Sequence, residues 1–140
     1  GSRAIQLTTA GGVTHAREKW FTNRVRFMFL SAVRVGDFVY GTSGDFGPAF
    51  FIAIDAESGE EIFRERTFAR SQMVLAGSKL VILDEGGDLA IASVSPAGLE
   101  VHARTALMTE NAWTPPTLVG TRLYVRDRKN VLAVELGAGE

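Results

Sequence analysis

The chain has 140 residues, of which 46% are hydrophobic and 22% charged, a composition typical of a globular domain with a hydrophobic core. With 15 Lys and Arg against 16 Asp and Glu, the formal charge of −1 offers no basic field for binding nucleic acid. Cysteine is absent, which excludes a disulfide scaffold, a thiolate metal site and a cysteine nucleophile. The longest strongly apolar run, 50–54, is far shorter than the roughly 20 residues of a membrane-spanning helix, so we expect no membrane span.

The first predicted strands are 4–7 and 18–21, separated by a looser stretch rich in Thr and Gly. Residues 4–7, Ala-Ile-Gln-Leu, have the same pattern as residues 133–136, Ala-Val-Glu-Leu. We therefore expect residues 1–21 to form the last two strands of a repeating unit. A helix is a weak alternative to a strand for residues 14–20, but no segment has sustained helical periodicity.

Three similar hairpins follow, at 32–40, 73–82 and 116–125, each with two hydrophobic strands around a glycine turn. The turn glycines Gly36, Gly77 and Gly120 lie 41 and 43 residues apart. A repeat of about 40 residues, made of short strands and glycine turns, is typical of a β-propeller blade.

A second landmark follows each hairpin: an alanine that opens an alternating strand, with a glycine six positions later. The alanines are Ala53, Ala92 and Ala133. A fourth strand is expected after the first two copies, at 60–66 and 99–105, so the successive units should have two, four, four and three strands. The predicted fold is therefore all-β, a partial β-propeller of about three and a half four-stranded antiparallel blades. Its predicted units are 1–21, the end of one blade; 29–67 and 70–105, two blades; and 114–140, an incomplete blade.

The first copy of this landmark carries the most specific motif in the chain. Its residues are Ala53, Asp55, Ser58, Gly59, Glu60 and Phe63. It resembles the tryptophan-docking motif of quinoprotein-like (PQQ-like) β-propellers, Ala-x-Asp/Asn-x-x-Ser/Thr-Gly-Glu/Lys-x-x-Trp, with Phe63 in the place of the usual tryptophan. The expected role is structural, because Asp and Ser can bond their own turn and the aromatic ring packs between sheets. In the second copy His102 is expected at the aromatic position.

The resemblance implies two kinds of function. Quinone-dependent dehydrogenases of this superfamily bind the quinone and a calcium ion at the propeller centre, through acidic and amide ligands and often a vicinal cysteine pair. This sequence has no cysteine and no assembled ligand set, so we predict no catalytic, cofactor-binding or metal-binding residues and no cofactor. We favour a non-catalytic scaffold for protein or small-ligand binding, as a fragment of a larger propeller or one part of an oligomeric propeller. The alternative is the C-terminal part of a quinone-dependent oxidoreductase whose cofactor site lies in missing blades. The resemblance alone favours a periplasmic or secreted location.

Two features suit chemistry but have ordinary structural interpretations. Residues 84–88, Asp-Glu-Gly-Gly-Asp, bring together carboxylates of the kind that calcium prefers. Their spacing does not match an EF-hand loop, and we favour a hairpin turn with solvated acids. The only histidines are His15, expected in solvent, and His102, expected in a packing role.

Loops that lead into each first strand, and loops between second and third strands, are expected on one rim of the propeller. The candidate rim residues are Arg24, Arg26, Arg70, Asp84, Glu85, Trp113 and Arg126. Mixed charged and aromatic loop residues suit a ligand or protein surface. The alternative is ordinary rim salt bridges, with Trp113 packed on the prolines that follow it. The expected partners are another protein or a second copy joined through open blade edges. In one such arrangement the Trp20 strand lies beside residues 133–136, within a chain or across a dimer.

Overall fold

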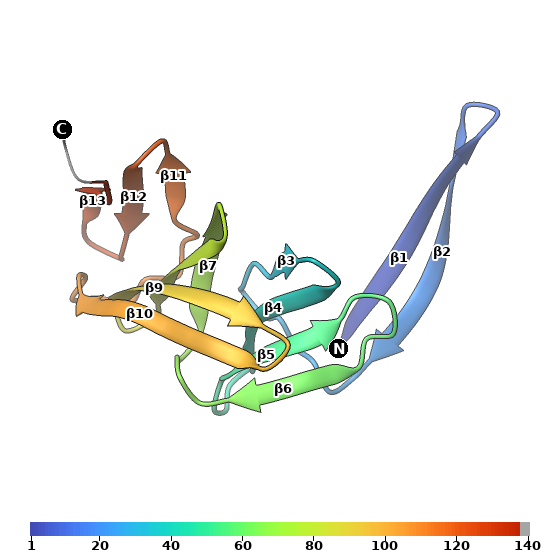
Figure 1. The fold of residues 1–140 in the computed structure, drawn as a ribbon, viewed down its shortest axis with the longest axis horizontal. Helices are drawn as coiled ribbons and strands as arrows, with labels where there is room; N and C mark the ends of the chain where they lie inside the picture. The colour runs from blue at the N-terminus through green and yellow to red at the C-terminus, as the bar shows by residue number, and fades with distance from the viewer. Residues whose placement is uncertain (138–140) are drawn as a thin grey trace.

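The computed structural model describes residues 1–137, and this part of the chain contains thirteen β-strands. The strands form four antiparallel sheets of two, four, four and three strands (Figure 1). The predicted all-β fold and the predicted number of strands in each sheet are confirmed. No helix within residues 1–137 has the length and apolarity needed to cross a bilayer.

The N-terminal hairpin consists of β1 (Ser2–Ala10) and β2 (Val13–Thr22) and projects away from the rest of the chain (Figure 1). The prediction of a looser stretch between two short strands is wrong, because both strands continue to a two-residue turn at Gly11 and Gly12. Both glycines have positive φ, +59° and +79°, the conformation that a tight hairpin turn requires. Residues 14–20 are therefore strand rather than helix.

The other three sheets are meanders in which each strand pairs with the next one in sequence. The first sheet comprises β3 (Val33–Val35), β4 (Phe38–Ser43), β5 (Phe50–Asp55) and β6 (Glu61–Glu65). The second comprises β7 (Ser71–Ala76), β8 (Lys79–Asp84), β9 (Asp88–Ser95) and β10 (Gly98–Ala106). The third comprises β11 (Thr117–Val119), β12 (Arg122–Arg126) and β13 (Val131–Glu135).

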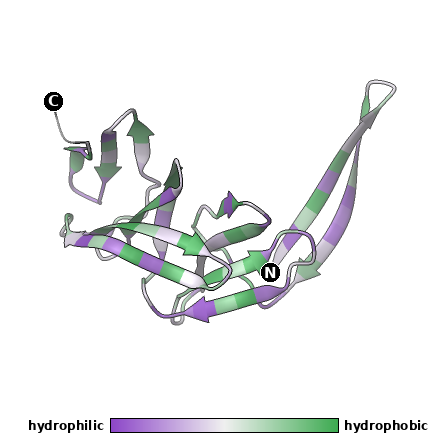
Figure 2. Ribbon diagram, in the orientation of Figure 1, coloured by the Kyte–Doolittle hydropathy of each residue, from purple (hydrophilic) through white to green (hydrophobic). Residues whose placement is uncertain are grey.

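The second sheet lies between the other two and is buried on both faces. Leu80 and Ile82 of β8 pack with Tyr40 and Phe51 of the first sheet. Their neighbour Leu83 packs instead with Leu123 of the third sheet. Successive side chains of a strand point to opposite faces, so one continuous apolar run serves two interfaces. Figure 2 shows the hydrophobic character of inner strands such as β5 and the more hydrophilic outer strands β6 and β10.

The alanine landmark is one residue out of register in the second sheet. Ala53 lies opposite Tyr40 in the first sheet, and the corresponding pair in the second sheet is Ile91 opposite Val81. Ala92, the expected landmark, therefore faces the other side of its sheet and packs toward the first sheet. A slip of one residue exchanges the two faces of a strand, so similarity of sequence letters alone misplaced this residue.

A β-bulge recurs in the outer strand of three hairpins. Its extra residue comes immediately before the residue that pairs with the landmark alanine or with the residue in the equivalent position. The opposed pairs are Ala4 with Trp20, Ala53 with Phe63, and Ile91 with Ala103. His102 occupies the bulge of β10, and Ala103 takes the position of the aromatic residue. The expectation that His102 is the aromatic equivalent in the second sheet is therefore wrong, because Gly98 already pairs with Ser95 in the strand while Gly59 lies in its turn, so counting from the glycines is out by one residue.

The sheets at the two ends of the described chain each keep an unpaired edge. Within residues 1–137, β2 pairs with β1 alone and β13 pairs with β12 alone. The N-terminal hairpin lies at the opposite end of the molecule from β13 (Figure 1), so the expected pairing of the Trp20 strand with residues 133–136 within one chain is wrong. Trp20 packs on the first sheet instead.

Candidate functional site

The turn after β5 is held by the side chain of Asp55. Its Oδ1 accepts hydrogen bonds from the backbone N–H groups of Glu57 at 2.9 Å and Ser58 at 2.8 Å, and from Ser58 Oγ at 3.0 Å. These bonds, those from Ser58 foremost, lower the pKa of Asp55. The backbone N–H of Asp55 donates to Glu60 O at 2.8 Å, which closes the turn around Gly59. The residues of the docking motif thus act on their own turn.

Trp20 of the N-terminal hairpin packs on this turn. Its Nε1 donates a hydrogen bond to Ala56 O at 3.0 Å, and its ring lies against Gly59. Trp20 therefore stands in the N-terminal hairpin where Phe63 stands in the first sheet, at the residue after the bulge. Sequence spacing missed this residue because β1 and β2 are longer than the corresponding strands of the first sheet.

A pocket of about 530 Å³ lies where loops of all three larger sheets meet. Its lining residues are Phe29, Leu30, Asp45, Phe46, Arg70, Gln72, Glu85, Ala112 and Trp113. Three of the predicted rim residues, Arg70, Glu85 and Trp113, are among them. The pocket is built from segments that lead into the sheets and from the β4–β5 and β8–β9 loops, and we refer to it as the rim pocket.

The polar groups of the rim pocket bond to one another. Arg70 Nη1 pairs with Glu85 Oε1 at 2.9 Å, and the other carboxylate oxygen of Glu85 accepts a hydrogen bond from Trp113 Nε1 at 3.1 Å. The remaining guanidinium nitrogens of Arg70 donate to the backbone oxygens of Asp45, at 2.8 Å from Nε, and Gly47, at 3.1 Å from Nη2. Charge and hydrogen-bonding capacity are thus satisfied internally, which leaves this part of the pocket close to neutral.

Gln72, only 2% exposed, ties two of the pocket segments together. Its Nε2 donates to Phe29 O and, at 3.2 Å, to Trp113 O, while its Oε1 accepts the N–H of Ser31 at 3.2 Å. Phe29 is held with φ of +61°, and it is the only non-glycine residue of the described chain with positive φ. Left-handed backbone is costly for a bulky residue, by about 1–2 kcal/mol, so the surrounding contacts maintain a strained segment here.

Three aromatic side chains of the rim pocket face solvent. Phe46 is 91% exposed, Phe29 72% and Trp113 53%. The guanidinium of Arg128 lies 5.9 Å from the ring centre of Trp113, within range of a cation–π contact. Clustered exposed aromatic residues on one concavity are the usual sign of a binding surface.

The other predicted rim residues are dispersed. Arg26 pairs with Asp45 at 2.5 Å, beside the rim pocket, and this contact lowers the pKa of Asp45. Arg24 lines a separate polar pocket of about 530 Å³, between the end of β2 and the turn at Ser58. Arg126 is exposed at the end of β12 and does not line the rim pocket.

Asp84 is 5% exposed, so the expectation of solvated acids in its turn is wrong for this residue. Its Oδ2 accepts the N–H of Ala69 at 2.7 Å and its Oδ1 accepts the N–H of Gly86 at 2.7 Å. Asp127 Oδ2 in the same way accepts the N–H of Glu110, at 3.3 Å, from the segment that leads into the third sheet. This hydrogen bond, from an Asp at the end of the second strand to the segment that leads into the sheet, was not identified from the sequence. Asp84 and Asp127 nevertheless share the 43-residue spacing of Gly77 and Gly120.

The carboxylates of residues 84–88 have different partners rather than a common centre. Asp88 pairs with Arg104 at 2.8 Å, Glu85 pairs with Arg70, and Asp84 binds backbone N–H groups. In the described part of the chain no group of three or more His, Asp or Glu side chains is placed to hold a metal ion. These acids therefore do not fit the calcium and quinone that the resemblance implies.

The comparisons with known proteins give a likeness of fold. No protein-family model and no curated protein matches this chain. The crystal structure of BamB from Moraxella catarrhalis matches it with a TM-score of 0.55 and 20% identity, over 73% of this chain and 29% of the BamB chain. The match spans less than a third of BamB. It confirms the predicted resemblance in fold: the small antiparallel sheets of this chain are arranged like blades of a PQQ-like β-propeller.

Proposed function

We propose that this chain is part of a propeller scaffold without quinone-dependent catalysis and that its rim pocket binds an apolar side chain of a partner protein. The observation that carries the proposal is Phe29, which is both strained, at φ +61°, and largely exposed. Exposing an aromatic ring on left-handed backbone does nothing for the fold itself. Strain that the surroundings maintain at a concave surface is characteristic of binding sites.

The chemistry of the rim pocket favours an apolar occupant over a charged one. Arg70 and Glu85 neutralise each other and have no group left for a ligand charge. Phe29, Phe46 and Trp113 offer large rings whose burial contributes about 1.5–3 kcal/mol each. Aromatic rings in a pocket are also the residues that dominate the binding energy of protein interfaces.

The scaffold proposal includes the repeat units 1–21, 29–67, 70–105 and 114–140 as blades of one propeller. The unpaired edges of β2 and β13 support a place for this chain within a larger propeller or an oligomeric one. Unpaired strand edges template pairing with further strands, and proteins normally cover them. The scaffold would then hold the rim pocket in a rigid frame of three sheets.

The pocket is tested by NMR titration with two small probes, N-acetyl-phenylalanine amide and N-acetyl-lysine amide. The phenylalanine probe is expected to shift the indole N–H signal of Trp113, while the lysine probe leaves it unchanged. Phe46→Ser should weaken the phenylalanine probe about 10-fold, which corresponds to ~1.4 kcal/mol. Phe21→Ser, at an exposed ring of the other pocket, is the matched control and should bind normally. Equal binding of both probes, or no effect of Phe46→Ser, would overturn the proposal.

A further inference from the structure

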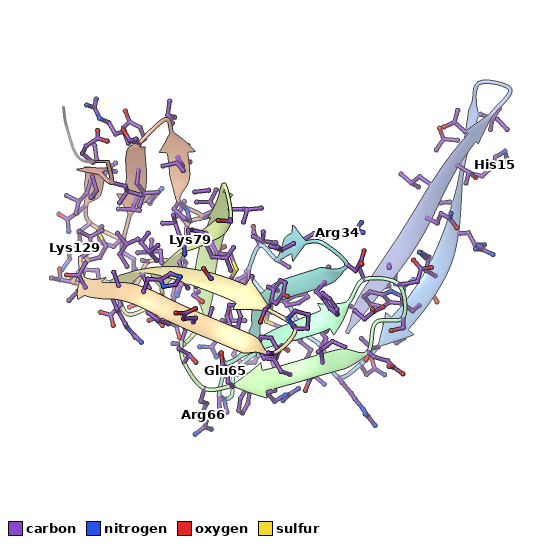
Figure 3. All side chains as sticks on the ribbon, viewed as in Figure 1. His15, Arg34, Glu65, Arg66, Lys79 and Lys129 are labelled. Atoms are coloured by element: carbon purple, nitrogen blue, oxygen red, sulfur yellow. The ribbon has the colours of Figure 1, made fainter. Side chains whose placement is uncertain are left out.

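A second group of functional side chains lies on the second sheet, away from the rim pocket. Lys79 of β8, Ser93 of β9 and His102 of β10 form one row across three neighbouring strands (Lys79 is labelled in Figure 3). Ser93 Oγ lies 2.7 Å from His102 Nε2 and 2.9 Å from Lys79 Nζ. Lys79 Nζ lies 2.8 Å from His102 Nε2, and Glu100 Oε1 lies 3.7 Å from His102 Nδ1.

The pairing of β9 with β10 places His102 on the face of Ser93. His102 is the extra residue between Val101 and Ala103, which lie opposite Ala92 and Ile91. Glu100 lies opposite Ser93, and His102, two residues further along β10, faces the same side of the sheet. His102 thereby reaches Ser93, a contact that its position in the sequence did not suggest.

The repeat itself does not require this polar row. Two residues after the turn glycine, the first sheet has Phe38 where the second sheet has Lys79. In the bulge, the first sheet has Ile62 where the second sheet has His102. Both positions accept apolar side chains in the same architecture. The row is therefore a particular property of the second sheet.

The donors and acceptors determine which ring nitrogen of His102 carries the proton. An ammonium group has donors and no acceptor, so Lys79 Nζ donates to Ser93 Oγ, and the Ser93 hydroxyl donates to His102 Nε2. The neutral imidazole then carries its proton on Nδ1, the nitrogen nearest Glu100. Nε2 presents its lone pair next to the hydroxyl of Ser93, which is the tautomer a general base needs.

We propose that Ser93 is a nucleophile that accepts small acyl groups from activated esters, with His102 as its general base. Ser93 Oγ attacks the ester carbonyl carbon while its proton passes to His102 Nε2. The bond from that carbon to the leaving alkoxide then breaks, and the proton passes from Nε2 to the leaving group. Water, deprotonated by the same nitrogen, releases the acid from the acyl-serine and restores the hydroxyl.

The neighbouring charges act on different stages, because the Lys79 ammonium, 2.8 Å from Nε2, opposes the imidazolium but favours negative charge on the ester. The Lys79 ammonium, 2.9 Å from Ser93 Oγ, stabilises the negative charge that develops on the oxygens of the attacked ester. Glu100 acts as a positioning residue, because its carboxylate lies beside Nδ1 and favours the imidazolium that forms. The side chains of His102 and Glu100 are 30% and 78% exposed, so a small ester such as an acetyl ester can approach them from solvent.

The test incubates the intact protein with p-nitrophenyl acetate and follows p-nitrophenol release and protein mass. One acetyl group is expected, and peptide mapping should place it on Ser93. Ser93→Ala should lose both the acetyl group and the burst of p-nitrophenol. His102→Gln should slow acetylation about 100-fold, the usual contribution of a general base. Glu100→Gln should move the midpoint of the pH–rate profile to lower pH.

Ser95→Ala is the matched control, because Ser95 lies two residues further along β9 and its Oγ accepts the N–H of Ala97 at 3.2 Å. This variant should be acetylated at the rate of the unmodified chain. Circular dichroism of each variant shows that it is folded. Acetylation of the Lys79 amine at an unchanged rate in Ser93→Ala would overturn the proposal, as would a folded native protein that is not acetylated at all. Neither result bears on the rim pocket, which has its own test.

Discussion

The indole ring of Trp20 lies directly against the α-carbon of Gly59. A Cβ built on Gly59 would come within 2.6 Å of Trp20 Cδ2, closer than side-chain atoms approach in proteins. Gly59 also has φ of +76°, in the left-handed region that favours glycine. The turn therefore needs glycine for two reasons, its backbone conformation and the docking of the N-terminal hairpin.

Gly59→Ala should lower the free energy of unfolding by about 3 kcal/mol, the sum of left-handed backbone strain and overpacking against Trp20. Gly36→Ala is the matched control, because Gly36 has φ of +60° and no neighbour within 4 Å of an added Cβ. This control should lose about 1 kcal/mol from backbone strain alone. Urea unfolding measures both changes, and equal losses would mean that the Trp20 contact adds nothing.

Arg70→Lys should lower the free energy of unfolding by about 2 kcal/mol, because an ammonium cannot replace a guanidinium that bonds several groups at once. Arg70 reaches Glu85, Asp45 O and Gly47 O, and a lysine leaves at least one of these acceptors unpaired. Arg34→Lys is the control, since Arg34 is exposed and its carboxylate partner Asp37 lies 4.0 Å away. A loss at Arg70 no greater than that at Arg34 would contradict this account of the rim pocket.

Asp127 should make stability depend on pH in acid. Burial opposes its ionisation, but the N–H groups of Lys129, Asn130 and Glu110 and the amide of Asn130 donate to its carboxylate, and the pKa falls to about 2. The ionised group stabilises the fold fully above its unfolded pKa of about 4, and this contribution is lost as the pH falls through about 2.

Asp127→Asn should therefore be less stable than the unmodified chain near neutral pH, and the difference should shrink as the pH falls from about 4 to about 2. Urea midpoints across this range provide the measurement. Asp37→Asn, at an exposed carboxyl, should show no comparable trend. A difference for Asp127→Asn that stays constant down to the lowest pH would refute the assignment.

Phe29 tests the link between strain and the rim pocket. Phe29→Gly should be at least as stable as the unmodified chain, because glycine adopts positive φ without the strain that Phe29 carries. Phe29→Val should lose about 1–2 kcal/mol, since a β-branched residue tolerates this conformation poorly. Both variants should bind N-acetyl-phenylalanine amide more weakly, as they lack the ring. Equal stability of the two variants in thermal unfolding would show that the segment relaxes when Phe29 is replaced.

Much of the fold could be predicted from sequence because its signals are local. Alternating apolar residues around Gly36, Gly77 and Gly120 predict hairpins, and their spacing predicts repeated sheets. The errors arose where a shift of one residue between the sheets matters. The bulge at His102 and the displaced landmark at Ile91 leave no mark in the hydrophobic pattern, because both neighbours of each residue also suit a strand.

The residues of the candidate sites also divide into those with a local sequence signal and those without one. Arg70, Glu85 and Trp113 could be named as rim residues from the loops in which they lie, but Phe29 and Gln72 carried no local signal. Sequence reasoning also found no partner for His102, since Ser93 and Lys79 belong to other strands. Each of these contacts joins residues that are distant along the chain.

Taken alone, the sequence determined the all-β class, the number of strands and the repeat, since strand periodicity and turn glycines act over a few residues. The tertiary structure decided which side chains meet. Packing of three sheets brings the loops of the rim pocket together, and the pairing of β9 with β10 brings His102 beside Ser93. Such contacts depend on strand register and on the angle between sheets, which are set by packing of the whole core rather than by any single segment.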